Sequence, residues 1–469
     1  MTSDKKQISL FLSLVPIAAM IGLVVIGHLI YKVDLRFILL VSAIIAGFTA
    51  YAAGTKVDQM FEAYASNIKR AFPVILILMA IGGIVGTWMY SGTVPYLIYY
   101  GLQFLHPNFV LVSAFLVTAM VSTFTGTSWG SAATAGVAFI GIGASMGIPL
   151  PMVAGAALSG AVFGDKVSPI SDTTNLCSLA SDITVYQHIK GMLPNVILAG
   201  LVAAIGFTLL GIFYSGSTNG GGEVQKIITD LEGLYNFNVF MLLPALVVFI
   251  GGYKGFHPVV LMILSSVIAV LIGMLSNGFA ATDGANAIFS GFNIEMAGGG
   301  TSVSESLNVL LNRGGFEGML TGAVLYAILA IGFGSFMEVC GALDRLMRGL
   351  LSFVRSAFGL VISAFMAGGI LNAVSGNAAF SILTTGQLFK QPFKDKNISA
   401  SVLSRSMENS MTLLESLLPW HVTAIYMSGI FGVATFAYLP FAFFNMAGIV
   451  LFFVLAWREV VHGKTTLDQ

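Results

Sequence analysis

The sequence contains few charged residues. Only 9% of its 469 residues are Asp, Glu, Lys or Arg, whereas 57% are hydrophobic. Soluble proteins carry about 25% charged residues. Basic and acidic residues number 21 each, so the formal net charge is zero and nothing indicates a nucleic-acid partner. The composition therefore predicts a polytopic, all-helical membrane protein.

Cysteine is also scarce. Cys177 and Cys340 lie in or beside apolar segments, which excludes a disulfide framework and indicates small buried hydrophobic side chains. No phosphate loop or His/Cys metal cluster is found, and 127–130 (TSWG) lacks the full nucleophile-elbow pattern. We therefore expect neither an enzyme nor a cofactor.

Apolar segments of about 20 residues, enough to cross a hydrocarbon core of roughly 30 Å, follow one another along the chain. The first has a short basic flank and no small-residue cleavage site, so we interpret it as an uncleaved span. A polar linker at 215–238 separates two predicted repeats, 1–214 and 239–469, and the second repeat contains a polar insertion at 276–318. The apolar segments are 8–30, 35–53, 71–90, 109–146, 151–190, 193–214, 239–251, 256–275, 319–340, 357–389, 399–430 and 433–457.

The two halves share a weak internal similarity. Gly126 and Gly376 follow a hydroxyl residue in matching apolar segments, 250 positions apart. With a loop seven residues shorter in the second half, Asp165 aligns with Glu408 and Asp172 with Glu415. A single match of this kind arises easily by chance in a Gly-rich chain, but the shared register of the matches predicts an internal repeat.

Basic residues predict the orientation of the repeats, because Lys and Arg favour cytoplasmic loops. They place the N-terminus inside and require 109–146 and 357–389 to be re-entrant hairpins. The predicted fold is two inverted-topology repeats of about five transmembrane helices, each with a re-entrant hairpin and a broken helix, and both termini cytoplasmic. Parallel repeats with fully spanning hairpins are the alternative. The basic residues used are Lys5, Lys6, Lys56, Lys69, Arg70, Arg345, Arg348, Arg355, Lys390, Lys394 and Lys396.

One polar stretch, 164–175, interrupts the first repeat. Polar groups at bilayer depth usually face a partner or a water-filled cavity. Pro169 breaks the helix, and hydroxyl and carboxylate oxygens suit sodium. The alternative is that Lys166 neutralises Asp165 in a structural pair. The predicted cation- and proton-binding residues here are Asp165, Ser168, Asp172, Thr173, Thr174 and Asn175, with sodium at Asp165 and Asp172.

The second repeat carries a similar polar stretch. Glu408, Asn409 and Glu415 are predicted to complete the cation and proton site. Arg405 is near enough in sequence to pair with Glu408, which leaves a structural role open for that acid. His421 can titrate near neutral pH and either relays protons or is simply hydrogen-bonded.

The two hairpin tips are further candidates. Thr127 and Ser128 in the first tip, and Ser375 and Asn377 in the second, offer oxygen ligands beside glycines. Helix N-termini at these tips can also hold an anionic group. Close helix packing by small residues is the alternative.

Three runs carry a resemblance to a known family: GTSWGSAATAGVAFIGIGASMGIP (126–149), GDKVSPISDTTNL (164–176) and SRSMENSMTLLESLLPWHVTAIY (404–426). They resemble the NhaC-type sodium/proton antiporters of the ion-transporter superfamily. The resemblance implies inverted repeats with hairpins and cation-coupled exchange, in a family that includes malate/lactate exchangers. The third run departs from the family pattern at Asn409, Met411 and His421, which bears on ion stoichiometry and cargo.

The function predicted is a secondary antiporter of the bacterial cytoplasmic membrane that exchanges sodium for protons by alternating access. The alternatives are a sodium- and proton-coupled exchanger of small organic anions or amino acids, a gated cation channel, and a structural membrane subunit. Sodium is the transported and coupling ion. The expected partners are sodium, protons and membrane lipid, with a small organic acid and a second copy in a homodimer as further candidates.

Overall fold

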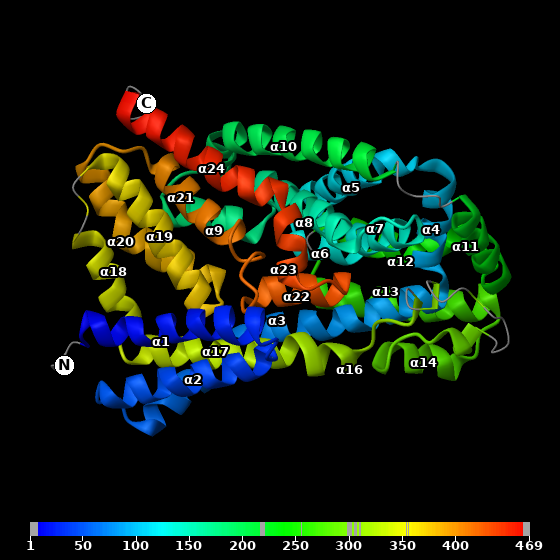
Figure 1. Cartoon of the computed structure of the whole chain (residues 1–469), viewed down its shortest axis with the longest axis horizontal. Coiled ribbons are helices and arrows are strands. Elements are labelled where there is room, and N and C mark those ends of the chain that lie inside the picture. The colour runs from blue at the N-terminus through cyan, green and yellow to red at the C-terminus, as the bar shows by residue number, and fades with distance from the viewer. Residues whose placement is uncertain are drawn as a thin grey trace.

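The computed structural model describes residues 8–215, 221–254, 256–297, 303, 307–308, 311–352, 354 and 356–462. These residues form helices and no strand, which confirms the all-helical prediction (Figure 1). Within these described ranges, eight helices are long and apolar enough to cross a membrane, or up to 11 if each bent helix pair is one span. The protein is therefore a multi-pass membrane protein. Lys5, Lys6 and Arg355, which the orientation argument used, lie outside the described residues.

In the first half, the helix that contains the predicted span 71–90 is much longer than predicted. It begins at Val57 and is bent by 40° beside Pro73. Hydropathy detects only the apolar part of a helix, so the polar turns before Pro73 were missed. The helices are α1 (Leu10–Gly22), η1 (Leu23–Ile30), α2 (Leu35–Ala52), α3 (Val57–Ser91), α4 (Thr93–Phe104), η2 (Pro107–Phe109), α5 (Val110–Thr125), α6 (Ser128–Ser131), η3 (Ala132–Gly136), α7 (Val137–Ser145), α8 (Leu150–Val167), α9 (Asp172–Ala180) and α10 (Val185–Ser215).

In the second half, described parts of the polar insertion 276–318 pack against α3. The N–H of Gly315 donates to the carbonyl of Gly82 at 2.7 Å, and a Cβ at Gly86 would lie 2.0 Å from the carbonyl oxygen of Ala287. Glycine is needed for such a close approach. The helices are α11 (Gly221–Leu234), η4 (Val239–Leu242), α12 (Leu243–Tyr253), α13 (Pro258–Asn277), α14 (Ala281–Phe289), η5 (Ile294–Ala297), α16 (Phe316–Met319), η6 (Leu320–Val324), α17 (Leu325–Val339), α18 (Ala342–Ser352), α19 (Ala357–Ser375), α20 (Ala378–Asp395), α21 (Ala400–Thr412), α22 (Val422–Phe431), α23 (Thr435–Tyr438), η7 (Leu439–Phe441), α24 (Phe443–Trp457) and η8 (Arg458–His462).

The helix starts show how the two halves correspond. α21 begins 250 positions after α8, and α22 begins 250 positions after α9. The gap of seven residues in the predicted alignment is therefore wrong, because the longer break before α22 makes up for the shorter α21. At this constant offset Asp165 corresponds to Glu415, and Ser171 corresponds to His421.

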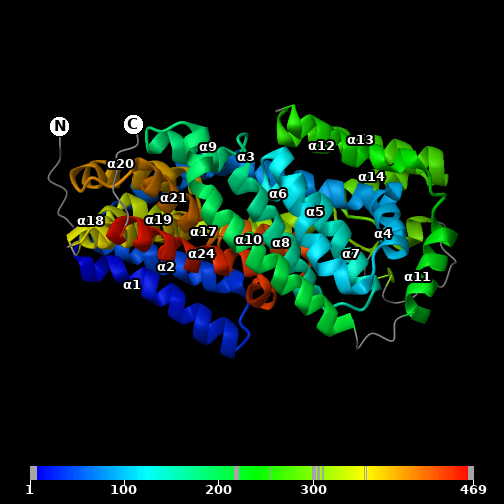
Figure 2. The ribbon, with the colours of Figure 1, turned by 90° about the horizontal axis from the view of Figure 1, so that it is seen from above.

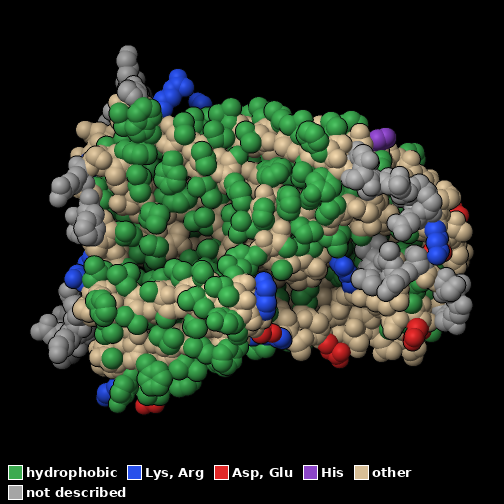
Figure 3. All heavy atoms as spheres, viewed as in Figure 1, with side chains coloured by type: hydrophobic (Ala, Val, Ile, Leu, Met, Phe, Trp, Pro, Cys, Tyr) green, Lys and Arg blue, Asp and Glu red, His purple; other side chains and the backbone are tan. Residues whose placement is uncertain are grey.

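The outer surface fits a membrane environment. Hydrophobic side chains cover most of the face in Figure 3, with few charged side chains, mostly near its ends and lower edge. On α10, Leu201, Ile205 and Leu209 are each more than half exposed. The start of α1 and the end of η8 lie at the same end of the molecule in both ribbon views (Figures 1 and 2).

Candidate functional site

A cavity of about 1370 Å³ lies where the turns after α5 and α19, the predicted hairpin tips, meet the two helix breaks between α8 and α9 and between α21 and α22. This convergence brings together residues that are up to about 300 positions apart in the chain. Most of the predicted site residues line the cavity, and the described lining also includes several aromatic side chains. The predicted residues in the lining are Thr127, Ser128, Asp165, Asp172, Thr173, Asn175, Ser375, Asn377, Glu415 and His421.

The first break separates α8 from α9, and polar side chains stabilise it. Proline at 169 has no N–H and interrupts the helical ladder. The Nδ2 of Asn175 donates to the carbonyls of Pro169 at 3.0 Å and Ser171 at 2.7 Å. The hydroxyl of Thr174 donates to the backbone carbonyl of Asp165 at 3.4 Å. The structure thus gives Asn175 and Thr174 the task of satisfying the carbonyls that the break exposes.

The two tips are built alike. Gly126 ends α5 with a φ of 66°, and Gly376 ends α19 with a φ of 63°, a left-handed conformation that glycine adopts readily. The next residue caps the returning helix in each case. The hydroxyl of Thr127 accepts from the N–H of Gly130 at 3.3 Å, and Oδ1 of Asn377 accepts from the N–H of Phe380 at 3.0 Å.

Asp165 and Glu415 face the cavity from corresponding positions of the two halves. Both are largely buried, with 9% of each residue exposed. The side chain and backbone N–H of Ser128 face the Asp165 carboxylate, as does Ser171. Glu415 is close enough to Asp165 for their charges to interact. Burying two like charges that interact is costly, so a bound proton or cation would stabilise these carboxylates.

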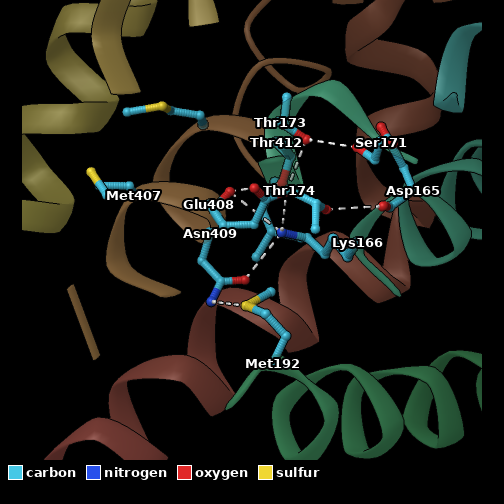
Figure 4. A network of polar contacts seen from close by, with 12 residues as sticks. Asp165, Lys166, Ser171, Thr173, Thr174, Met192, Met407, Glu408, Asn409 and Thr412 are labelled. Atoms are coloured by element: carbon cyan, nitrogen blue, oxygen red, sulfur yellow. Dashed lines mark hydrogen bonds and ion pairs between the residues drawn. The ribbon is translucent and has the colours of Figure 1, made fainter. Parts of the chain in front are cut away.

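Glu408 does not line the cavity, and its partner is Lys166. The Lys166 Nζ lies 3.9 Å from Oε1 of Glu408 and 3.2 Å from Oδ1 of Asn409 (Figure 4). Lys166 therefore pairs with Glu408, and not with Asp165 as the structural alternative required. The pairing of Arg405 with Glu408 that the sequence left open is not formed either, because Arg405 pairs with Glu459 on η8, directly after α24.

His421 caps the start of α22. Its Nδ1 accepts from the N–H of Thr423 at 3.1 Å, so that nitrogen carries no proton. Its Nε2 lies 3.2 Å from Oδ1 of Asn372 and therefore donates to it. Both ring nitrogens are engaged in the neutral form, so the geometry favours the hydrogen-bonded interpretation over proton relay.

The remaining predicted residues differ in how far they are exposed and in what they contact. Asp172 begins α9 and is exposed on the cavity wall. The hydroxyl of Thr173 lies 3.2 Å from Oε1 of Glu408, to which it donates, and 3.2 Å from the hydroxyl of Ser171. Ser168 is fully buried, and its hydroxyl has no hydrogen-bond partner in the described part of the chain.

Sequence reasoning missed two asparagines at the site. The Nδ2 of Asn195 on α10 donates to Oδ1 of Asn409 at 3.2 Å. Asn372 on α19 contacts His421 and faces Glu415. Both asparagines are buried within strongly apolar helices, and an isolated amide in such a segment was the signal that could have identified them.

Known proteins resemble this chain along nearly its whole length. The sequence model of the Na⁺/H⁺ antiporter family matches residues 6–174 and 160–458. An uncharacterized Na⁺/H⁺ antiporter of Haemophilus influenzae is 36% identical over 93% of each chain. The malate-2H⁺/Na⁺-lactate antiporter of Bacillus subtilis is 34% identical over 98% of this chain and 96% of its own. The Na⁺/H⁺ antiporter NhaC of Bacillus subtilis is 34% identical over 81% of this chain and 82% of its own.

Proposed function

From the premise that this chain belongs to the Na⁺/H⁺ antiporter family, we propose that it exchanges sodium for protons across the bacterial cytoplasmic membrane. Family membership makes it a transporter of the antiporter type. We further propose which residues bind the ions and how the binding site becomes exposed to each side of the membrane in turn.

The pair of Asp165 and Glu415 carries the proposal. These carboxylates are buried, line the same cavity and interact electrostatically. Sodium prefers oxygen ligands, and the hydroxyls of Ser128 and Thr423 beside the two acids can supply them. A proton and a sodium ion then compete for the same negative charge. Such competition couples the two fluxes, because the site releases one ion when it takes the other.

Alternating access is the mechanism that this arrangement supports best. The paired tips and the paired breaks recur at a constant offset, as two related halves would. We interpret the halves as inverted repeats whose relative movement exposes the acid pair to one side at a time. We propose that both termini lie in the cytoplasm in this arrangement, because Lys and Arg favour cytoplasmic loops.

Exchange of a small organic acid is the second candidate, and the size of the cavity favours it. A volume of about 1370 Å³ is far more than a sodium ion fills. The charge of the lining argues the other way, because Asp165, Asp172 and Glu415 all face it. In the described lining Arg70 is the single Lys or Arg, and it lies 3.9 Å from Glu338. We therefore favour a cation as the principal cargo.

A flux assay on purified protein in proteoliposomes tests the proposal. A sodium gradient directed into the proteoliposomes should drive protons out, and a sodium gradient directed outward should drive protons in. Malate, lactate and amino acids, added one at a time, should not change the sodium flux. Sodium flux that depends on an added organic acid would favour the second candidate. Current without proton coupling would indicate a channel.

A further inference from the structure

Lys166 and Glu408 form an ion pair that is sealed from water. Both side chains are 0% exposed. The described lining of the cavity includes Asp165 but neither Lys166 nor Glu408. The ion pair therefore lies directly behind the cavity wall, one residue along the chain from a carboxylate that faces the cavity.

The ammonium of Lys166 occupies a cage of oxygen atoms. Besides Oε1 of Glu408, its Nζ contacts Oδ1 of Asn409 at 3.2 Å and the backbone carbonyl of Glu408 at 3.4 Å. A lysine ammonium has three donors and no acceptor, so three oxygens match its needs. Figure 4 shows Lys166 extending from α8 toward these groups on α21.

The cage is held in place by neighbouring side chains. The Nδ2 of Asn195 donates to the same Oδ1 of Asn409, at 3.2 Å, and the Nδ2 of Asn409 contacts the sulfur of Met192. The hydroxyl of Thr173 donates to Oε1 of Glu408. Helices α9, α10 and α21 thus fix the oxygens, whereas α8 supplies the positive charge.

The same oxygens would suit a sodium ion. A carboxylate, an amide oxygen and a backbone carbonyl are typical ligands of hard cations. Two more buried oxygens of this cluster, Oε2 of Glu408 and Oδ1 of Asn195, have no hydrogen-bond partner within the described part of the chain. A free cation is nevertheless excluded, because a second positive charge next to the Lys166 ammonium would be strongly repelled in a buried site.

We propose that Lys166 is a tethered cation that permanently fills a second cation site and confines mobile sodium to the acid pair of Asp165 and Glu415. Lys166 thereby sets how many sodium ions the protein binds. The transport consequence, a fixed ratio of sodium to protons, rests on the proposed function. The occupancy of the cage does not.

Counting the sodium ions bound by purified protein tests this inference without requiring transport. Lys166→Met should bind one more sodium ion per chain than the wild type, because Glu408 then lacks its counter-charge. Lys166→Arg and the double variant Lys166→Met/Glu408→Gln should bind the same number as the wild type. Lys390→Met is the matched control, because that lysine pairs with Asp182 on the surface. An unchanged sodium count in folded Lys166→Met would overturn the inference.

Transport gives a second readout in proteoliposomes. The ratio of sodium to protons should rise in Lys166→Met and return to the wild-type value in the double variant. If Lys166→Met does not fold, the other two variants decide: a sodium count that differs from the wild type in either would overturn the inference. If the wild type does not exchange sodium for protons, the proposed function fails. The number of bound sodium ions still tests whether Lys166 fills the second cation site.

Discussion

The break between α8 and α9 differs from the break between α21 and α22. The first break is short, and the helix that follows it, α9, begins with an exposed acid, Asp172. The second break runs from Leu413 to His421, and buried His421 caps the start of the helix that follows it, α22. The acids Asp165 and Glu415 correspond, but Glu408 is neutralised by a lysine from the first half. Asp165 and Glu415 thus face the cavity from the two breaks, whereas Glu408 lies behind its wall in an ion pair.

The largest expected effect tests whether the two corresponding acids act together. Asp165→Asn and Glu415→Gln should each abolish most sodium-dependent proton exchange, about 100-fold or more. Removing one charge from a buried ion site costs about 3 kcal/mol, and each 1.4 kcal/mol is tenfold. Proton flux in proteoliposomes after a sodium pulse measures this. The control is Asp182→Asn, whose side chain is 66% exposed.

Strong loss in only one of the two variants would contradict the paired site. It would then indicate that the halves differ in function at this position as well, and that the correspondence of Asp165 with Glu415 is structural alone.

Asp172 should have an intermediate effect. It lines the cavity but is exposed, so water screens its charge more than that of Asp165. Asp172→Asn should raise the sodium concentration for half-maximal exchange by up to about fivefold, since two unit charges about 4 Å apart in water interact by about 1 kcal/mol and each 1.4 kcal/mol is tenfold. Titrating the exchange rate with sodium measures the shift. Full exchange with wild-type sodium dependence would remove Asp172 from the site.

The sequence predicted much of the fold and the location of the breaks. Apolar length identifies spans, and proline or glycine among polar residues marks interruptions, because both signals are local. The partner of Lys166 was missed because it lies more than 240 positions away. The packing of the insertion 276–318 on α3 was also missed, although the spacing of Gly82 and Gly86 is typical of a close helix contact.

Substitution of His421 should lower the stability moderately and leave the pH dependence of exchange unchanged. His421→Ser keeps a capping oxygen but loses the hydrogen bond to Asn372, so the free energy of unfolding should fall by about 1 kcal/mol. The pH profile of exchange should keep its shape, because both ring nitrogens are engaged in the neutral form. Thermal unfolding in detergent measures the stability. Proton flux between about pH 5 and 8, the range in which an ordinary imidazole changes its charge, measures the pH profile. A displaced pH profile would restore the proton-relay hypothesis.

The smallest effect is expected at an exposed ion pair, which contrasts with the buried pair of Lys166 and Glu408. A hydrogen bond from Arg36 lowers the pKa of Asp34 to about 2, from 3.8. Because the folded-state pKa is lowered, the stability from this pair is present above about pH 4 and is lost as the pH falls toward 2. Both side chains are nearly half exposed, so the contribution should stay below about 1 kcal/mol.

Asp34→Asn isolates the charge, because asparagine can still cap α2. The variant should unfold slightly more easily than the wild type at pH 7, and the difference should vanish as the pH falls through about 2, the folded-state pKa of Asp34. A large loss at neutral pH would mean that burial is not what distinguishes the two ion pairs.

The central claim is that sodium and protons compete for Asp165 and Glu415. Proton release on sodium binding, measured with purified protein in weakly buffered detergent solution, tests it most directly. Sodium should displace protons from the wild type, whereas Asp165→Asn/Glu415→Gln should release none. Sodium binding without proton release, or release that persists in the double variant, would contradict it.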